Sequence, residues 1–144
     1  VKKTNKDELK QKFTDLEMII KEGKKVQQLL GDELKHIWGE AAIVPSIKER
    51  AECKQKVSDK YDGKAEYLRD VSRFSGKFIR FEELEEAYKL LQEIEGLEII
   101  NIKNKFLHPD VLGYADKNLN AAYTLPGGAV HICEIQLHLS PIRI

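Results

Sequence analysis

Cysteine and long apolar runs are both scarce in this 144-residue sequence. Two cysteines are too few for a disulfide framework or a zinc site, so we expect Cys133 to be a small core residue. No apolar run is long enough to span a bilayer, and no signal-peptide pattern is present. These absences favour a reducing compartment, the cytoplasm, and argue against a membrane partner.

An excess of charge of either sign is also missing, because 24 Lys and Arg residues balance 24 Asp and Glu residues. A net charge of zero argues against a general nucleic-acid or membrane coat protein but leaves room for a local charged patch. With 42% hydrophobic and 33% charged residues, residues 1–144 suit a single globular domain. Because the chain starts at Val1 without Met, we expect this domain to belong to a longer parent protein.

The first third of the chain is predicted to be helical. Apolar residues recur at steps of four, three and four within residues 4–30, which is typical of an amphipathic helix. Gly31 and Gly39 bracket a second, shorter helical piece. We therefore interpret residues 1–43 as a helical cover for a core that carries no chemistry of its own.

A helix-start signal follows at Pro45, where Ser46 can accept a hydrogen bond from the first turn and Glu49 can reach back. The helix predicted from this signal places Arg50 and Lys54 one turn apart on one face. Two further lysines lie at the margins of that face, Lys48 and Lys56. Acidic neighbours dilute this basic face, so an ordinary charged surface is an equally good interpretation.

Residues 44–144 are predicted to form the core of the domain. Four segments alternate apolar and polar residues and are expected to be strands: residues 71–80, 97–106, 118–125 and 130–138. An amphipathic helix is predicted over residues 82–95, and Pro126-Gly-Gly128 predicts a hairpin between the last two strands. This pattern indicates an α+β fold, with a mixed or antiparallel sheet of about four to five strands covered on one face by helices.

The polar sides of these strands predict a shared surface that is cationic and rich in hydrogen-bonding groups. Its members are Arg73, Ser75, Lys77, Asn101, Lys103, Lys105, Asn118, Asn120, Glu134, Gln136 and His138. Glu134 lies in mid-strand among apolar residues, where a carboxylate is costly unless a cation or a donor meets it. Such a face is either simply solvated or a site for a polyphosphate with its Mg²⁺. One carboxylate rarely holds Mg²⁺ well, and Asp70, just before the first strand, is the best-placed second ligand.

Three of these features occur in an order that resembles a known family. Asp70 before a strand, Gly113-Tyr114 in a loop and Glu134-Ile-Gln-Leu in the last strand resemble the synthetase domain of RelA/SpoT-type alarmone enzymes, over roughly residues 44–139. The Gly-Tyr-x-Asp-x-Asn-Leu run resembles a divergent branch of that family. The resemblance implies a nucleotidyltransferase-like sheet and transfer of pyrophosphate from ATP to the 3′-hydroxyl of a guanosine nucleotide or another acceptor.

The resemblance also implies roles for individual residues. Asp70 and Glu134 resemble the catalytic carboxylates that hold Mg²⁺, and Glu134 also helps to take the proton from the attacking hydroxyl. Tyr114 resembles the aromatic residue that stacks on the acceptor base. The cations that resemble phosphate ligands are Arg50, Lys54 and Lys103. The polar face adds further expected nucleotide contacts: Arg73, Lys77, Lys105, Asn118, Gln136 and His138.

Three other functions remain as alternatives on sequence alone. The domain could be an inactive nucleotide-binding or regulatory module that kept the fold and lost turnover. It could be a toxin-like domain, even a secreted effector, that pyrophosphorylates adenosine nucleotides or RNA 3′ ends. It could also be an interaction domain whose helical first third docks a partner protein.

Overall fold

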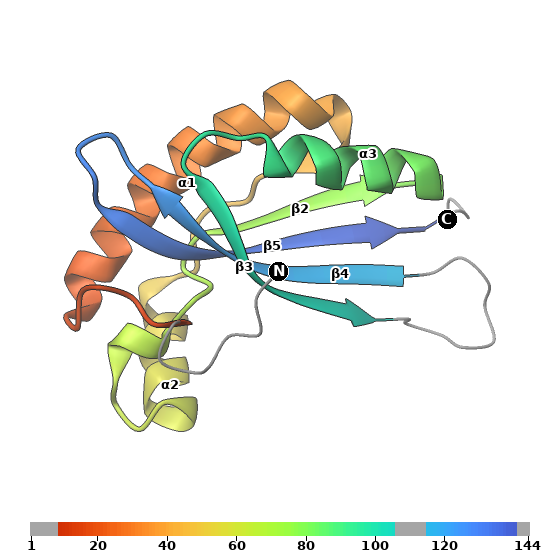
Figure 1. Cartoon of the computed structure of the whole chain (residues 1–144). Helices are drawn as coiled ribbons and strands as arrows, with labels where there is room; N and C mark the ends of the chain where they lie inside the picture. Colours follow the sequence, from red (N-terminus) through yellow and green to blue (C-terminus); the bar gives the residue numbers. More distant parts are fainter. Residues whose placement is uncertain (1–8, 106–114, 141–144) are drawn as a thin grey trace.

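Five strands form one mixed sheet in the order β1-β2-β5-β4-β3 (Figure 1). The structure is a computed structural model that describes residues 9–105 and 115–140, with residues 104, 105 and 115 described by their backbone alone. The helices are α1 (Leu16–Trp38), α2 (Arg50–Lys60) and α3 (Phe81–Gln92), with short 3-10 turns at Gly39–Ala41 and Ala65–Tyr67. The strands are β1 (Ala42–Ile43), β2 (Arg73–Phe78), β3 (Leu97–Lys105), β4 (Ala115–Thr124) and β5 (Val130–Leu139).

The last strand, β5, lies in the middle of the sheet. It pairs in parallel with β2 on one side and antiparallel with β4 on the other. The outer strands β1 and β3 pair antiparallel with β2 and β4. This arrangement confirms the predicted α+β class and the mixed sheet of about four to five strands.

The main hydrophobic core lies between the sheet and the two helices α1 and α3, which run across the same face (Figure 1). Leu34 of α1 and Leu91 of α3 are fully buried against Ile135 and Leu137 of β5. Fully burying one such side chain stabilises the fold by roughly 1.5–3 kcal/mol. The apolar side of each strand is therefore committed to the helices, as predicted.

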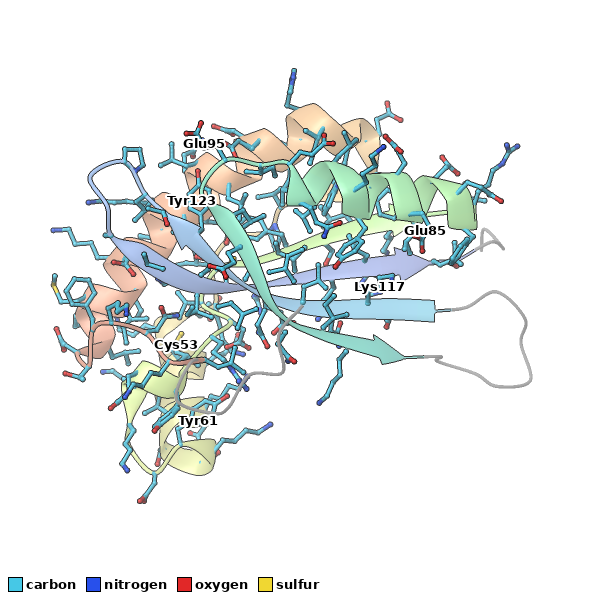
Figure 2. The ribbon with its side chains drawn as sticks, viewed as in Figure 1. Cys53, Tyr61, Glu85, Glu95, Lys117 and Tyr123 are labelled. Carbon is cyan, nitrogen blue, oxygen red and sulfur yellow. The ribbon has the colours of Figure 1, made fainter. Side chains whose placement is uncertain are left out.

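A second hydrophobic cluster joins the first half of α1 to α2 and to the segment before β2. It contains Ile19, Ile20, Cys53, Val57, Ala65, Leu68 and Val71. Figure 2 shows Cys53 in this region, near the junction of α1 and α2. Because Leu68 and Val71 are fully buried in this cluster, the residues between them, including Asp70, have a fixed position at the start of β2.

Two side-chain amides fasten the first third of the chain to the strands. Gln27 of α1 accepts a hydrogen bond from the Arg73 backbone N–H (3.0 Å) and donates one to the Arg73 carbonyl (2.9 Å). Gln11 makes the same pair of bonds with Ile132 of β5, at 2.9 and 2.8 Å. Each amide thus pairs with the backbone as a neighbouring strand would, so the first third does more than cover the core.

The helix boundaries differ from the prediction in three places. The helix expected from residue 4 begins at Leu16, and residues 9–15 of the described chain lie outside it. A single helix, α1, runs through Gly31, where the sequence predicts a break. A Cβ at Gly31 would lie 2.7 Å from the Val44 side chain, so this glycine serves close packing; Gly39, with φ of 58°, is the one that ends the helix. The next helix begins at Arg50 instead of Ser46, with Glu49 at its N-cap.

The strands also depart from the prediction in detail. The strand expected from residue 118 begins at Ala115, and the two-residue β1 was not predicted. A register shift between Ile99 and Asn101 turns Ile99, instead of Ile100, towards the core beside Ile102. In the part of the chain that the structure describes, no helix is long and apolar enough to cross a membrane.

Candidate active site

The face of the sheet away from α1 and α3 carries polar side chains in three cross-strand rows, set by the strand register. The first row is Arg73, Glu134, Asn120 and Asn101; the second is Ser75, Gln136, Asn118 and Lys103; the third is Lys77, His138 and Asp116. Neighbouring rows are about 6.7 Å apart along a strand. The predicted polar surface is therefore continuous over four strands.

A pocket of about 300 Å³ lies at the first-row end of this face. It is lined by α2, by the segment before β2 and by strands β3, β4 and β5: Lys56, Tyr61, Arg69, Asp70, Asn101, Lys103, Asn118, Leu119, Asn120 and Glu134. Figure 2 shows Tyr61 at the α2 side of the molecule. Asp70 and Glu134 come from segments far apart in the sequence and line the same pocket.

Asp70 is nearly buried, at 8% exposure, and is held by two lysines. Its Oδ2 atom accepts hydrogen bonds from the Lys48 and Lys56 ammonium groups, each at 2.8 Å. Burial raises the pKa of this carboxyl, but the hydrogen bonds and charges of the two lysines outweigh it, and the pKa lies below its usual range. Its other oxygen, Oδ1, is buried without a protein partner. Asp70 is therefore a charged carboxylate at neutral pH, with one buried oxygen that no described protein group pairs.

Glu134 projects from the middle of β5 and is partly exposed. Its Oε1 atom accepts a hydrogen bond from the Gln136 amide at 2.5 Å. Its backbone N–H donates to the Ser72 carbonyl at 3.1 Å, which ties β5 to the chain two residues beyond Asp70. The mid-strand carboxylate of Glu134 therefore has a hydrogen-bond donor on its own strand.

Lys56 experiences the charge of both carboxylates. Its partial burial lowers the pKa of the ammonium group, but the hydrogen bond and charge of Asp70, with smaller contributions from Tyr61 and Glu134, raise the pKa above its ordinary value. Lys56 is therefore fully charged at neutral pH. Its ammonium group interacts favourably with the charges of both Asp70 and Glu134.

The donor set of this pocket fits Mg²⁺ that arrives with a phosphate ligand. Mg²⁺ keeps several waters and is commonly held by one or two carboxylates together with substrate phosphates. Asp70 and Glu134 supply two carboxylates, and the unpartnered Oδ1 atom of Asp70 supplies a buried oxygen. Among the described residues, no group of three or more His, Cys, Asp or Glu side chains could hold a metal without such help.

Three of the predicted contacts lie at or beside the pocket. Lys103 and Asn118 line it, and the Asn118 side-chain oxygen is buried without a partner. Arg73 is the cross-strand neighbour of Glu134, and its Nε atom is also buried without a partner. These unpaired polar atoms suit a ligand that brings its own donors and acceptors.

The two basic residues predicted on α2 lie elsewhere. Arg50 forms an exposed ion pair with Glu17 at 2.7 Å, and Lys54 is exposed; neither lines the pocket. The reason is the orientation of α2, whose Cys53 and Val57 pack into the second cluster and turn Lys56 towards Asp70. The signal for Lys56 was available in the sequence, because its neighbours at 53 and 57 mark the buried side of the helix.

The third row of the polar face lies outside the pocket lining. The Nδ1 atom of His138 is hydrogen-bonded to Asp116, whose side chain is almost buried. The sequence prediction assigned Asp116 to a loop and therefore missed this pair. Lys77 is exposed at the edge of the row. The Lys105 side chain and all of Tyr114 lie outside the described residues.

The opposite face of β5 carries a second polar group, which is wholly buried. His131 Nδ1 lies 2.7 Å from Glu22 Oε1, and its Nε2 lies 3.5 Å from the Ser72 hydroxyl. Ser72 donates to the Gly23 carbonyl at 2.7 Å. Because Ser72 and His131 have no exposed surface, this group is structural. Cys133 is fully buried, its pKa is raised to about 12, and its thiol is a core residue.

Comparison with known proteins identifies the fold. No protein-family model and no curated protein sequence matches the chain. Among solved structures, the small alarmone synthetase 1 from Bacillus subtilis bound to its product pppGpp is similar, with a TM-score of 0.69 and 16% identity over 84% of this chain and 72% of that chain. A GTP pyrophosphokinase family protein from Streptococcus pneumoniae has a TM-score of 0.68 and 17% identity, over 84% and 68%.

A third similar structure is the type VI effector Tas1 in complex with its immunity protein. Its TM-score is 0.54, with 21% identity over 85% of this chain and 60% of that chain. At these identities the likeness establishes the fold. The chain therefore has the fold of the small alarmone synthetases, as the resemblance in sequence implied.

Proposed function

We propose that this chain transfers pyrophosphate from ATP to the 3′-hydroxyl of a nucleotide, with Mg²⁺ held by Asp70 and Glu134. The observation that carries this proposal is the position of the two carboxylates in one pocket, next to the cations Lys56 and Lys103. A small alarmone synthetase with the same fold has been solved with the ATP analogue AMPCPP, which supports ATP as the donor.

The cations of the pocket would bind and orient the donor. Lys56, Arg69 and Lys103 line it from three different segments, so a polyphosphate between them meets positive charge on several sides. Bound Mg²⁺ would neutralise charge on the phosphoryl oxygens. Reactions of this class depend mostly on such positioning and charge stabilisation, which a preformed pocket provides.

Glu134 would accept the proton of the attacking hydroxyl. In this reaction the 3′-oxygen of the acceptor forms a bond to the β-phosphorus of ATP, the bond from that phosphorus to the α–β bridging oxygen breaks, and AMP leaves. The released proton needs an acceptor within hydrogen-bond reach. The Gln136 amide fixes one oxygen of Glu134, and the other oxygen is left for this role.

The direct test is product formation by purified protein with Mg²⁺, ATP and each candidate acceptor. We expect AMP release with a pyrophosphorylated product, and at least a hundredfold loss in Asp70→Asn and in Glu134→Gln. Glu82→Gln, which removes an exposed carboxylate on α3, is the matched control. If wild type equals the double variant Asp70→Asn/Glu134→Gln for every acceptor, the proposed activity is wrong.

The acceptors to test include guanosine nucleotides, adenosine nucleotides and RNA 3′ ends. The similarity to a type VI effector supports including the last two. Calorimetry with AMPCPP distinguishes the enzyme from an inactive regulatory module, because such a module would bind the nucleotide without releasing AMP. Absence of both binding and turnover would exclude either function.

A further inference from the structure

Two lysines share one oxygen of Asp70, and they differ in how firmly each is held. The Lys48 backbone N–H donates to the Val71 carbonyl at 3.1 Å, which fixes Lys48 beside the second hydrophobic cluster. Its side chain is 14% exposed and does not line the pocket. The Lys56 side chain is 24% exposed and lines the pocket together with Glu134. Of the two, Lys56 is free to move into the pocket without disturbing the backbone.

The charge of Asp70 is balanced without a metal. The two lysines that donate to Asp70 are positively charged, and Arg69 and Lys103 add two more positive charges at the pocket that Asp70 and Glu134 line. A divalent cation placed on Asp70 would then be repelled by an ammonium group only 2.8 Å from the same carboxylate. The metal and Lys56 therefore compete for Asp70. The competition ends if Lys56 finds another anion.

The phosphates of the donor are that anion. We infer that Lys56 is an exchangeable counter-ion of Asp70: it neutralises this carboxylate in the free protein and transfers to a phosphate of the donor when Mg²⁺ and ATP bind. This inference rests on the proposed function for the identity of the ligand. Its consequence is that the metal binds weakly alone, and that metal and nucleotide bind cooperatively.

The test measures metal binding directly, without turnover. Mn²⁺ is titrated into the full chain in the absence of nucleotide, and free Mn²⁺ is followed by its electron paramagnetic resonance signal. Lys56→Met removes the competing ammonium group, so we expect it to bind Mn²⁺ about tenfold more tightly than wild type. Lys54→Met makes the same change of charge on the same helix, but at an exposed position away from the pocket, and should bind Mn²⁺ as wild type does.

A second measurement, of nucleotide affinity, should change in the opposite direction. Calorimetry with AMPCPP at saturating Mg²⁺ should show that Lys56→Met binds the nucleotide about tenfold more weakly, because the phosphate has lost its cation. A role limited to packing would not raise metal affinity and lower nucleotide affinity in one variant. Lys56→Arg keeps the charge and should retain weak Mn²⁺ binding, which also covers the case in which Lys56→Met does not fold.

The outcomes separate this inference from the proposed function. If Lys56→Met and Lys54→Met bind Mn²⁺ equally, or Lys56→Arg binds it as tightly as Lys56→Met, the exchange is wrong even in an active enzyme. If no variant binds Mn²⁺, the inference is also overturned. If the chain releases no AMP with any acceptor but the opposite shifts appear, the exchange stands and the proposed reaction does not.

Discussion

The two faces of β5 are made from alternate residues of one strand, yet they are built in different ways. On the helix side, Cys133, Ile135 and Leu137 are fully buried and contribute to stability. On the other side, Glu134 and Gln136 are partly exposed and contact each other. Beside the polar side, three buried atoms have no hydrogen-bond partner among the described protein groups: Asp70 Oδ1, Arg73 Nε and Asn118 Oδ1. The core residues and the pocket residue Glu134 are therefore separated by a single step along the chain, and mutations should separate their effects on stability and on the proposed activity.

The largest loss of stability is expected on the helix side. Ile135→Ala would leave a cavity at the centre of the main core, where its side chain has no exposed surface. We expect the free energy of unfolding to fall by about 4 kcal/mol, measured by urea denaturation. Ile79→Ala, at an exposed isoleucine, is the control and should cost less than about 1 kcal/mol. Equal losses in the two variants would contradict the assignment of Ile135 to the core.

An intermediate loss is expected where the first third of the chain meets β5. Gln11→Ala would remove the side-chain partner of the Ile132 backbone N–H and carbonyl groups. Because both groups are buried, we expect a loss of about 2 kcal/mol in the same denaturation experiment. Gln28→Ala removes an exposed glutamine that donates a hydrogen bond to Asp32 in the next turn of its helix, and should change stability by less than about 0.5 kcal/mol.

The effect of Asp70 on stability should depend on pH. Its pKa is lower in the folded protein than in the unfolded chain, so its contribution is fully present above the unfolded value of about 3.9. The contribution is lost as the pH falls through the lower folded value. Wild type should therefore be more stable than Asp70→Asn at pH 6, and the difference should shrink between about pH 4 and pH 2. A difference independent of pH, followed by thermal unfolding, would show that the ion pairs do not stabilise the fold.

The smallest change in stability is expected on the polar face. Glu134→Gln keeps the size of the side chain and an oxygen that can accept the Gln136 hydrogen bond. The free energy of unfolding should change by less than about 0.5 kcal/mol, even though AMP release should be lost. A large loss of stability in Glu134→Gln would mean that the two faces of β5 are not separate in function.

The alternation of apolar and polar residues explains why the two faces of the sheet could be predicted from the sequence. A period of two assigns each residue of β5 to one face, so the placement of Glu134, His131 and Cys133 follows from their order alone. Asp70 was predicted as the partner of Glu134 from its position just before the first strand and from the resemblance. Local patterns of this kind do not depend on distant contacts.

What the sequence analysis missed depends on contacts between distant segments. The helix α1 continues through Gly31, which packs closely against Val44, and nothing near Gly31 in sequence indicates this contact. The backbone-like pairing of Gln11 links it to a residue 121 positions away. Each of these features is fixed by tertiary packing, which overrides local propensity.

The central position of β5 has a consequence for how the protein is made. Of the described strands it is synthesised last, yet it alone joins β2 to β4, so the sheet stays in two unconnected parts until β5 emerges from the ribosome. Pairing of β2 with β5 closes a long loop, which is a slow step in folding. The pocket lined by Asp70 and Glu134 forms in that same step, so a nascent chain that lacks β5 has neither a complete core nor the proposed binding pocket.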